Sequence, residues 1–271
     1  MSGNCFGSNA STPEVDNTPV GAVIKPCPTR NFVLVLGGPG KWNPKDKDHD
    51  AYWGNYFVAS QYVLGAKGIK ATTRLLSGEC VHWLVYEQAY ANRWETDYKS
   101  RIEHLEAQAK KYPHGYATFI KEYVTSVKQK YVAIDSYHDI WEAIHALPDE
   151  SLTRLFYFGH GGPKAFFLRW ARDDSRPASP GQVLGDPTED EIVDYSKIDA
   201  YRSWLAKKAK SSDSQVSKLY ACTTADWASK WHDATGLKAQ GSINKITFKN
   251  IRTGGGLSGL ESDGSPDWRS Y

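Results

Sequence analysis

Short runs of consecutive apolar residues recur along the chain, each bounded by glycine, proline or polar residues. The run from Phe32 to Leu36 is followed by Gly37-Gly38-Pro39-Gly40, a pattern typical of a buried parallel strand that ends in a tight loop. Similar runs predict strands over residues 81–86, 131–134, 152–158 and 218–221. Residues 243–251 alternate between apolar and polar side chains, which predicts a further strand.

Between these runs, apolar residues return every three or four positions, which is the spacing of one face of a helix. The pattern predicts helices over residues 50–64, 94–112, 195–210 and 226–235. Another helix is predicted before Pro148, with Asp135 or Ser136 as its cap, and residues 116–128 are expected to form a short helix or a loop.

Alternation of strands and helices implies right-handed crossovers and a mostly parallel sheet. We therefore predict an α/β fold, a three-layer sandwich with helices on both faces of the sheet, over residues 31–252. Residues 1–30 are rich in small polar residues and are expected to be a flexible leader, and residues 253–271 a Gly/Ser/Asp-rich tail. The irregular segment 173–194 is expected to hold a lid or an activation cut.

The balance of charge narrows the classes of partner. The chain has 33 basic and 31 acidic residues, a net charge of +2, which argues against a nucleic-acid-binding surface. No apolar run is long enough to span a bilayer, and the N-terminus lacks the features of a signal peptide. We expect a chain that is cytoplasmic where it is made, with secretion by a route without a conventional signal peptide as the alternative.

The cysteines and histidines lack the spacings of a metal site. Cys5, Cys27, Cys80 and Cys222 are far apart and form no CxxC pair, so neither a zinc site nor a disulfide framework is expected, and the thiols are predicted to be reduced. No HExxH or similar motif occurs, and we predict neither a catalytic metal nor a cofactor.

Two of the predicted strands end in residues that together make a nucleophile and its base. Residues 152–158 lead into Gly159-His160-Gly161-Gly162, and residues 218–221 lead directly into Cys222. The carboxyl ends of parallel strands lie at one edge of a sheet, where α/β folds bind ligands. A cysteine beside an imidazole and before a helix N-terminus has the setting that favours the thiolate. The N–H groups of Gly161 and Cys222 are the expected oxyanion donors.

A strand ending in His-Gly, followed several dozen residues later by a strand ending in Ala-Cys, resembles the caspase, legumain, clostripain and gingipain group of cysteine peptidases, clan CD. The resemblance rests on two short motifs and on the order of strands. It implies a caspase-like α/β fold, with His160 as acid/base and Cys222 as nucleophile. Tyr220 stands where caspases have glutamine, and Thr223 follows the cysteine, so the chain is not a caspase proper and cleavage after aspartate is not predicted.

Other side chains are candidates for substrate binding. Asp226 and Asp173, the latter beside Asp174, are interpreted as an acidic pocket for a basic side chain, against the alternatives of helix cap and solvated loop. His49 follows the first strand and is expected to line the cleft. Asp135 and His138 end another strand and are candidates to orient His160, with helix capping as the alternative for Asp135.

The first functional hypothesis is a cysteine hydrolase that cleaves a peptide or other amide bond, with a protein or peptide as substrate. The leader and the lack of a signal peptide resemble bacterial effector toxins exported with a carrier, which adds a carrier or inhibitory protein as an expected partner. The alternative is a catalytically silent binding module that uses surface aromatic residues. A third is a different cysteine or nucleotide-handling enzyme with its ligand at the Gly37–Gly40 loop, although that loop lacks the P-loop pattern.

Overall fold

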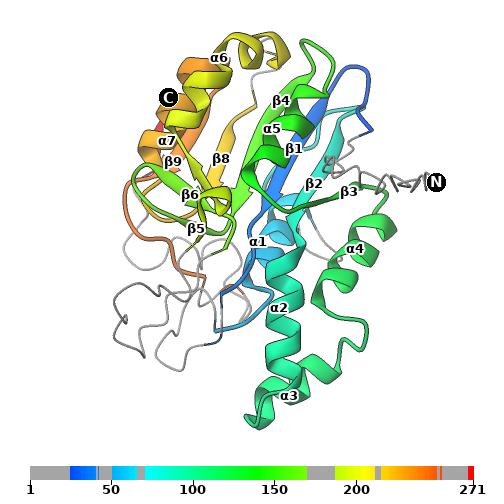
Figure 1. The fold of residues 1–271 in the computed structure, drawn as a ribbon. Helices are drawn as coiled ribbons and strands as arrows, with labels where there is room; N and C mark the ends of the chain where they lie inside the picture. The colour runs from blue at the N-terminus through cyan, green and yellow to red at the C-terminus, as the bar shows by residue number, and fades with distance from the viewer. Residues whose placement is uncertain are drawn as a thin grey trace, which may run out of the picture.

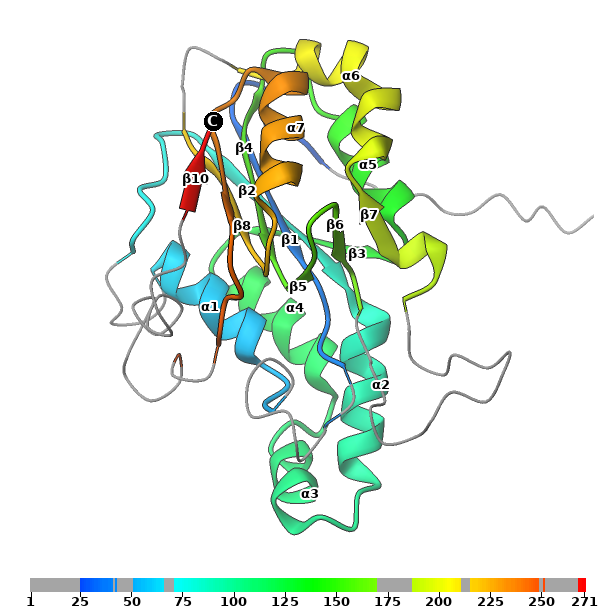
Figure 2. The same cartoon turned by 90° about the vertical axis from the view of Figure 1, so that its left-hand side faces the viewer.

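The computed structural model describes residues 25–40, 42, 51–65, 71–169, 187–210, 215–248, 251 and 268–271. The strands of its main sheet are β1 (Asn31–Leu36), β2 (Cys80–Tyr86), β3 (Lys130–Ile134), β4 (Leu152–Phe158), β8 (Ser217–Tyr220), β9 (Ala239–Ser242) and β10 (Trp268–Ser270). These seven strands have the order β10-β9-β8-β4-β1-β2-β3 and pair in parallel, except for the antiparallel pair β9–β10. Figure 1 shows the strands from β9 to β3, and β10 is labelled in Figure 2.

A second, three-stranded sheet lies at the carboxyl end of β4. Its strands are β5 (His160–Gly161), β6 (Ala165–Phe167) and β7 (Ile192–Asp194), and the short helix η1 (Glu189–Glu191) precedes β7. The helices are α1 (Asn55–Leu64), α2 (Glu87–Tyr98), α3 (Glu103–Lys110), α4 (Tyr116–Ser126), α5 (Tyr137–His145), α6 (Ser196–Lys208) and α7 (Ala225–Thr235).

Helices cover both faces of the main sheet, as Figure 2 shows. The alternation of side chains along β1 divides the core, because Val33 and Val35 pack with α5, α6 and α7, whereas Phe32, Leu34 and Leu36 pack with α1 and α4. The predicted α/β three-layer sandwich is thereby confirmed. All residues of β1 and β4 are buried, which is why Phe32–Leu36 and Leu155–Phe158 are uninterrupted apolar runs in the sequence; Asn31, Thr153 and Arg154 are the buried polar residues of these strands.

The predicted helix over residues 94–112 is wrong, since the structure has two helices there. The first, α2, begins directly after β2, and its buried side carries Arg93 and Asp97, a salt bridge of 2.9 Å. Because these charged residues occupy the buried face, α2 lacks the apolar repeat of three or four residues from which helices were predicted. The helix is interrupted near Ser100, whose Oγ accepts a hydrogen bond from the N–H of Ile102.

The predicted strand over residues 243–251 is also wrong for residues 243–248, which form no strand, while residues 249 and 250 lie outside the described part of the chain. The ladder ends at Ser242, whose Oγ–H donates to the carbonyl of Asn244 while the N–H of Asn244 donates back to this Oγ. The N–H of Thr223 donates to the same carbonyl, which is therefore bound to the turn after β8. The end of the expected tail is structured, because β10 pairs with β9.

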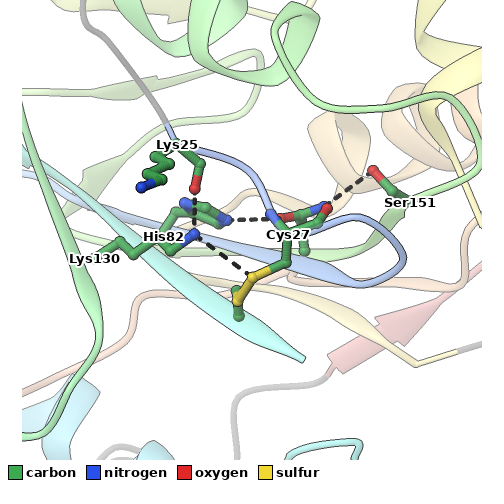
Figure 3. The surroundings of a disulfide bond; sticks show 7 residues. Lys25, Cys27, His82, Lys130 and Ser151 are labelled. Atoms are coloured by element: carbon green, nitrogen blue, oxygen red, sulfur yellow. Dashed lines mark hydrogen bonds between the residues drawn. A yellow bond between two sulfur atoms is a disulfide. The ribbon is translucent and has the colours of Figure 1, made fainter. Parts of the chain in front are cut away.

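The prediction of reduced thiols is contradicted for two of the four cysteines, since Cys27 and Cys80 form a disulfide (Figure 3). A separation of 53 residues gives no motif, and the sheet brings the two together because β2 starts beside the segment that leads into β1. Asn31 holds the same segment, accepting from the Cys27 N–H and donating to its carbonyl, each at 2.8 Å. Residues 25–30, counted above with the flexible leader, are therefore anchored to the sheet.

Loss of this disulfide is expected to lower the free energy of unfolding by about 4 kcal/mol, because it closes a long loop in the unfolded chain. Urea unfolding of the Cys27→Ala/Cys80→Ala variant against the oxidised wild-type chain measures the difference. Addition of dithiothreitol should bring the wild-type chain toward the variant and leave the variant unchanged. Equal midpoints for the oxidised wild-type chain and the variant would contradict the expectation.

His82 lies buried beside the disulfide, and its Nε2 is 2.8 Å from Asn31 Oδ1 (Figure 3). Burial, with a smaller contribution from the charge of Lys130, lowers the pKa of His82 from 6.5 to about 4. The unfolded chain thus takes up this proton at a higher pH than the folded chain does. The resulting stability is fully present above pH 6.5 and is lost as the pH falls toward 4.

We expect His82 to account for about 3 kcal/mol of acid destabilisation over this interval. His82→Gln, which keeps a donor for Asn31, should unfold in urea with a weaker dependence on pH than the wild-type chain. His138→Gln is the control, because His138 is exposed on α5 and should leave the pH dependence unchanged. Parallel pH profiles for wild type and His82→Gln would disprove the assignment.

Candidate functional site

The ends of β4 and β8 bring the predicted dyad to one edge of the sheet. These strands are parallel neighbours, and Phe158 lies opposite Tyr220. His160 and Cys222 each follow two residues later in their own chain. The Gly159 N–H lies 3.4 Å from the Tyr220 carbonyl, which continues the contact between the two segments past the strands.

This edge is also where the strand order reverses. The chain passes from β1 to β2 and β3 on one side, and from β4 to β8 and β9 on the other. In open α/β sheets, ligands bind outside the carboxyl ends of the strands at such a point. The strand order reverses between β1 and β4, and β4 is the strand that leads to His160.

The turn after β4 fixes the backbone of His160. A side chain at Gly159 would place its Cβ 2.1 Å from the hydroxyl of Tyr157, so only glycine fits. That hydroxyl lies 2.8 Å from the carbonyl of His160 and 2.6 Å from the carbonyl of Phe167, and the two residues are paired across β5 and β6. Tyr157 thus holds both strands of the hairpin that presents His160.

The imidazole of His160 packs against an aromatic side chain from α1. Tyr56, which is fully buried, meets the ring edge to face at a centroid distance of 5.5 Å. Tyr56 in turn contacts Phe248 at 4.9 Å. His160 as a whole is half-buried, and its ring is packed against Tyr56 on one side.

Cys222 keeps its thiol and is half-buried in the turn between β8 and α7. Thr223 has φ of 50°, a left-handed conformation that a β-branched residue rarely adopts, and such strain is frequent at functional turns. Thr224 is the N-cap residue of α7, which places Cys222 just outside the positive end of that helix.

Two backbone groups of Ile246 contact the sulfur of Cys222. The N–H of Ile246 donates to Sγ at 3.3 Å, and the carbonyl of the same residue accepts from the thiol at 3.6 Å. Ile246 is buried and follows the turn at residues 242–244 that ends β9.

Gly161 lies directly against the cysteine turn. A Cβ at this position would come within 2.7 Å of both the Cys222 carbonyl oxygen and the Ala221 Cβ, and within 2.9 Å of Thr224 Cγ2. Only a residue without a side chain allows the two turns to approach this closely. The two residues expected to provide the oxyanion donors are therefore in neighbouring turns.

The remaining candidates are placed differently. His49, Asp173 and Asp174 lie outside the described residues. Asp226 is exposed in the first turn of α7, a position where a carboxylate stabilises the helix by its charge.

The suggestion that Asp135 or His138 orients His160 is wrong. These residues follow β3, which is separated from β4 by two strands and so lies about 14 Å away. The cap of α5 is Ser136, in a reciprocal capping box with Asp139.

Charged and polar side chains at the ends of β2 and β6 are hydrogen-bonded to one another. Glu191 accepts from the hydroxyl of Tyr86 at 2.5 Å, from the N–H of Thr188 at 2.8 Å and from Nη2 of Arg169 at 3.2 Å. Burial raises the pKa of Tyr86, and so do the hydrogen bond to Glu191 and its charge. This cluster links η1 and β6 to β2.

The glycine loop after β1 has its groups bound within the protein. The N–H of Gly37 donates to the Phe158 carbonyl and that of Gly38 to the Leu168 carbonyl. Tyr90 and Arg93 donate to the carbonyls of Gly37 and Gly40. Donors that are already paired are not available to a phosphate, which weakens the nucleotide hypothesis.

Sequence reasoning missed Tyr56, Tyr157 and Ile246 as parts of the site. Tyr56 and Tyr157 belong to apolar patterns that indicate core, and Ile246 acts through its backbone, so no side-chain signal marks it. Among the described residues, His, Cys, Asp and Glu form no group of three that could hold a metal ion. No helix in the described part of the chain has the length and apolar character needed to cross a membrane.

Comparison with known proteins gives no relative for this chain: no protein-family model, no curated protein and no solved structure matches it.

Proposed function

We propose that this chain is a cysteine-dependent hydrolase of peptide or other amide bonds, with Cys222 as nucleophile and His160 as acid and base. The observation that carries the proposal is the pairing of β4 with β8, because the residues that follow these strands come to the edge where open α/β sheets bind their ligands. The approach of Gly161 to the cysteine turn and the position of Cys222 before α7 support the same chemistry.

In the proposed reaction, His160 takes the proton of the Cys222 thiol, and the thiolate attacks the substrate carbonyl carbon. The N–H groups of Gly161 and Cys222 stabilise the oxyanion of the tetrahedral intermediate. As the C–N bond breaks, His160 gives its proton to the departing amine and a thioester remains. His160 then takes a proton from water, which attacks the thioester and releases the acid and the thiol.

The resemblance to the caspase, legumain, clostripain and gingipain group agrees with this proposal, and the α/β three-layer sandwich is the kind of fold that it implies. A protein or peptide is the proposed substrate class. Action as an exported effector, with a carrier or inhibitory partner, is part of the same proposal. The Cys27–Cys80 disulfide supports export, because disulfides persist mainly in oxidising compartments.

The alternative of a silent binding module has less support. Most of the large aromatic side chains are core, including Trp53, Trp83, Trp227 and Trp231. Within the described residues, the large hydrophobic side chains that are well exposed are Tyr98, Phe119, Val127 and Ile243. Tyr98 ends α2, Phe119 and the C-cap residue Val127 belong to α4, and Ile243 follows β9. Scattered exposure of this kind does not make a docking surface.

The test is alkylation with iodoacetamide at pH 6 to 7, read by mass spectrometry. We expect Cys222 to be modified faster than Cys5, and this preference to be lost in His160→Ala. His138→Ala is the matched control, since it removes an exposed histidine from α5 and should label like the wild-type chain. A library of fluorogenic peptide amides then tests turnover.

Equal labelling of Cys222 in wild type and His160→Ala would remove the basis for the dyad. If Cys222 is labelled rapidly but no peptide amide is hydrolysed, the activated thiolate is supported and peptide amides are excluded as substrates. Other amides and esters would then be tested. Cys27 and Cys80 serve as internal controls, because the disulfide protects them from the reagent.

A further inference from the structure

Residues 242–248 follow β9, the neighbour of β8 on the side away from β4, and Ile246 of this segment contacts Cys222. We infer that the backbone N–H of Ile246 positions the sulfur of Cys222 and stabilises its thiolate, so that Ile246 is a positioning residue for the nucleophile. The inference rests on the proposed function and adds a sulfur donor to it.

The first step is the geometry at the sulfur. The Ile246 N–H donates to Sγ at 3.3 Å, and the Ile246 carbonyl lies 3.6 Å from Sγ as an acceptor for the S–H. In the thiol state both contacts hold the sulfur. When the proton moves to His160, the contact with the carbonyl is lost and the N–H remains, and a hydrogen bond to the charged form favours that form.

The second step is the rigidity of the donor. The carbonyl of Asn244 accepts from the N–H of Thr223 at 3.1 Å and from the Ser242 hydroxyl at 2.7 Å. The N–H of Ser242 lies 3.4 Å from the hydroxyl of Thr224. The segment is thus bound to the residues immediately after Cys222, and the Ile246 N–H is held in place before the thiolate forms.

The third step links the same segment to the base. Phe248 packs edge to face on Tyr56, and Tyr56 packs edge to face on the imidazole of His160. Ile246 and Phe248 are both buried in the core beneath this edge. One segment therefore contacts the nucleophile through its backbone and the base through one intervening ring.

The experiment is the pH profile of Cys222 alkylation in Ile246→Pro, which lacks the N–H, with Ile246→Val as the control that keeps it. We expect Ile246→Pro to react about tenfold more slowly at pH 6.5, with its profile displaced upward by about one pH unit. Ile246→Val should follow the wild-type profile. Coincident profiles for the proline and valine variants would overturn the inference.

A second measurement decides the matter where Ile246→Pro does not fold. In the wild-type chain labelled with ¹⁵N-isoleucine, the amide resonance of Ile246 should shift as Cys222 titrates, and the shift should vanish in Cys222→Ala. An Ile246 amide resonance that does not shift as Cys222 titrates would overturn the inference. Labelling of Cys222 at the same rate in wild type and in His160→Ala would instead overturn the proposed function. The two failures are therefore distinguishable.

Discussion

Replacement of Gly161 by alanine is expected to lower turnover of a peptide amide about 100-fold or more while the protein stays folded. The added Cβ would sit 2.7 Å from the carbonyl oxygen of Cys222 and 2.9 Å from Thr224 Cγ2. To relieve these contacts the two turns must separate, which displaces the proposed oxyanion donors from each other. Steady-state kinetics on the peptide amide selected from the library measures the loss.

Gly162→Ala is the matched control for this variant. A Cβ at Gly162 would meet the ring of Phe167 at 3.5 Å and the carbonyl of Ala165 at 4.0 Å, which are ordinary contacts. It should retain most of the activity, and both variants should unfold cooperatively in urea. Similar turnover by Gly161→Ala and the wild-type chain would show that the approach of the two turns does not matter for catalysis.

The second large effect concerns stability at the opposite end of the sheet. Glu79 and Arg154 form an ion pair in which the side chains are 0% and 2% exposed. The guanidinium of Arg154 also lies over the ring of Phe32 at 4.3 Å. Glu79→Ala is expected to lower the free energy of unfolding by about 3–5 kcal/mol, because it leaves a buried cation without its counter-charge.

Urea unfolding measures this loss, with Glu95→Ala as the control. Glu95 forms an ion pair with Lys99 on the surface of α2, where both side chains are more than half exposed, and its removal should leave the midpoint unchanged. Replacing both members of the buried pair, as Glu79→Leu/Arg154→Met, should recover most of the loss. A Glu79→Ala midpoint equal to that of wild type would mean that the buried pair contributes nothing to stability.

The elements that the sequence predicted well are those whose pattern is local. β1 and β4 are buried on both faces, and most of each strand is a continuous apolar run, Phe32–Leu36 and Leu155–Phe158. The helix α7 ends at Gly236 in the left-handed conformation that glycine favours. The α/β fold followed from the alternation of these elements. The predictions failed where burial contradicted polarity, as at Arg93 and Asp97 of α2, or where a turn competed with a strand, as after Ser242.

For the candidate site, the sequence by itself determined which reactive groups are present: a histidine among glycines and a cysteine before a helix, each after a buried strand. The tertiary structure decided that these strands are neighbours, that Gly161 must be glycine, and that Ile246 approaches the sulfur. It also decided the pairing of Cys27 with Cys80. Local patterns reflect the burial of each side chain, whereas strand order and contacts between distant residues arise only when the whole sheet assembles.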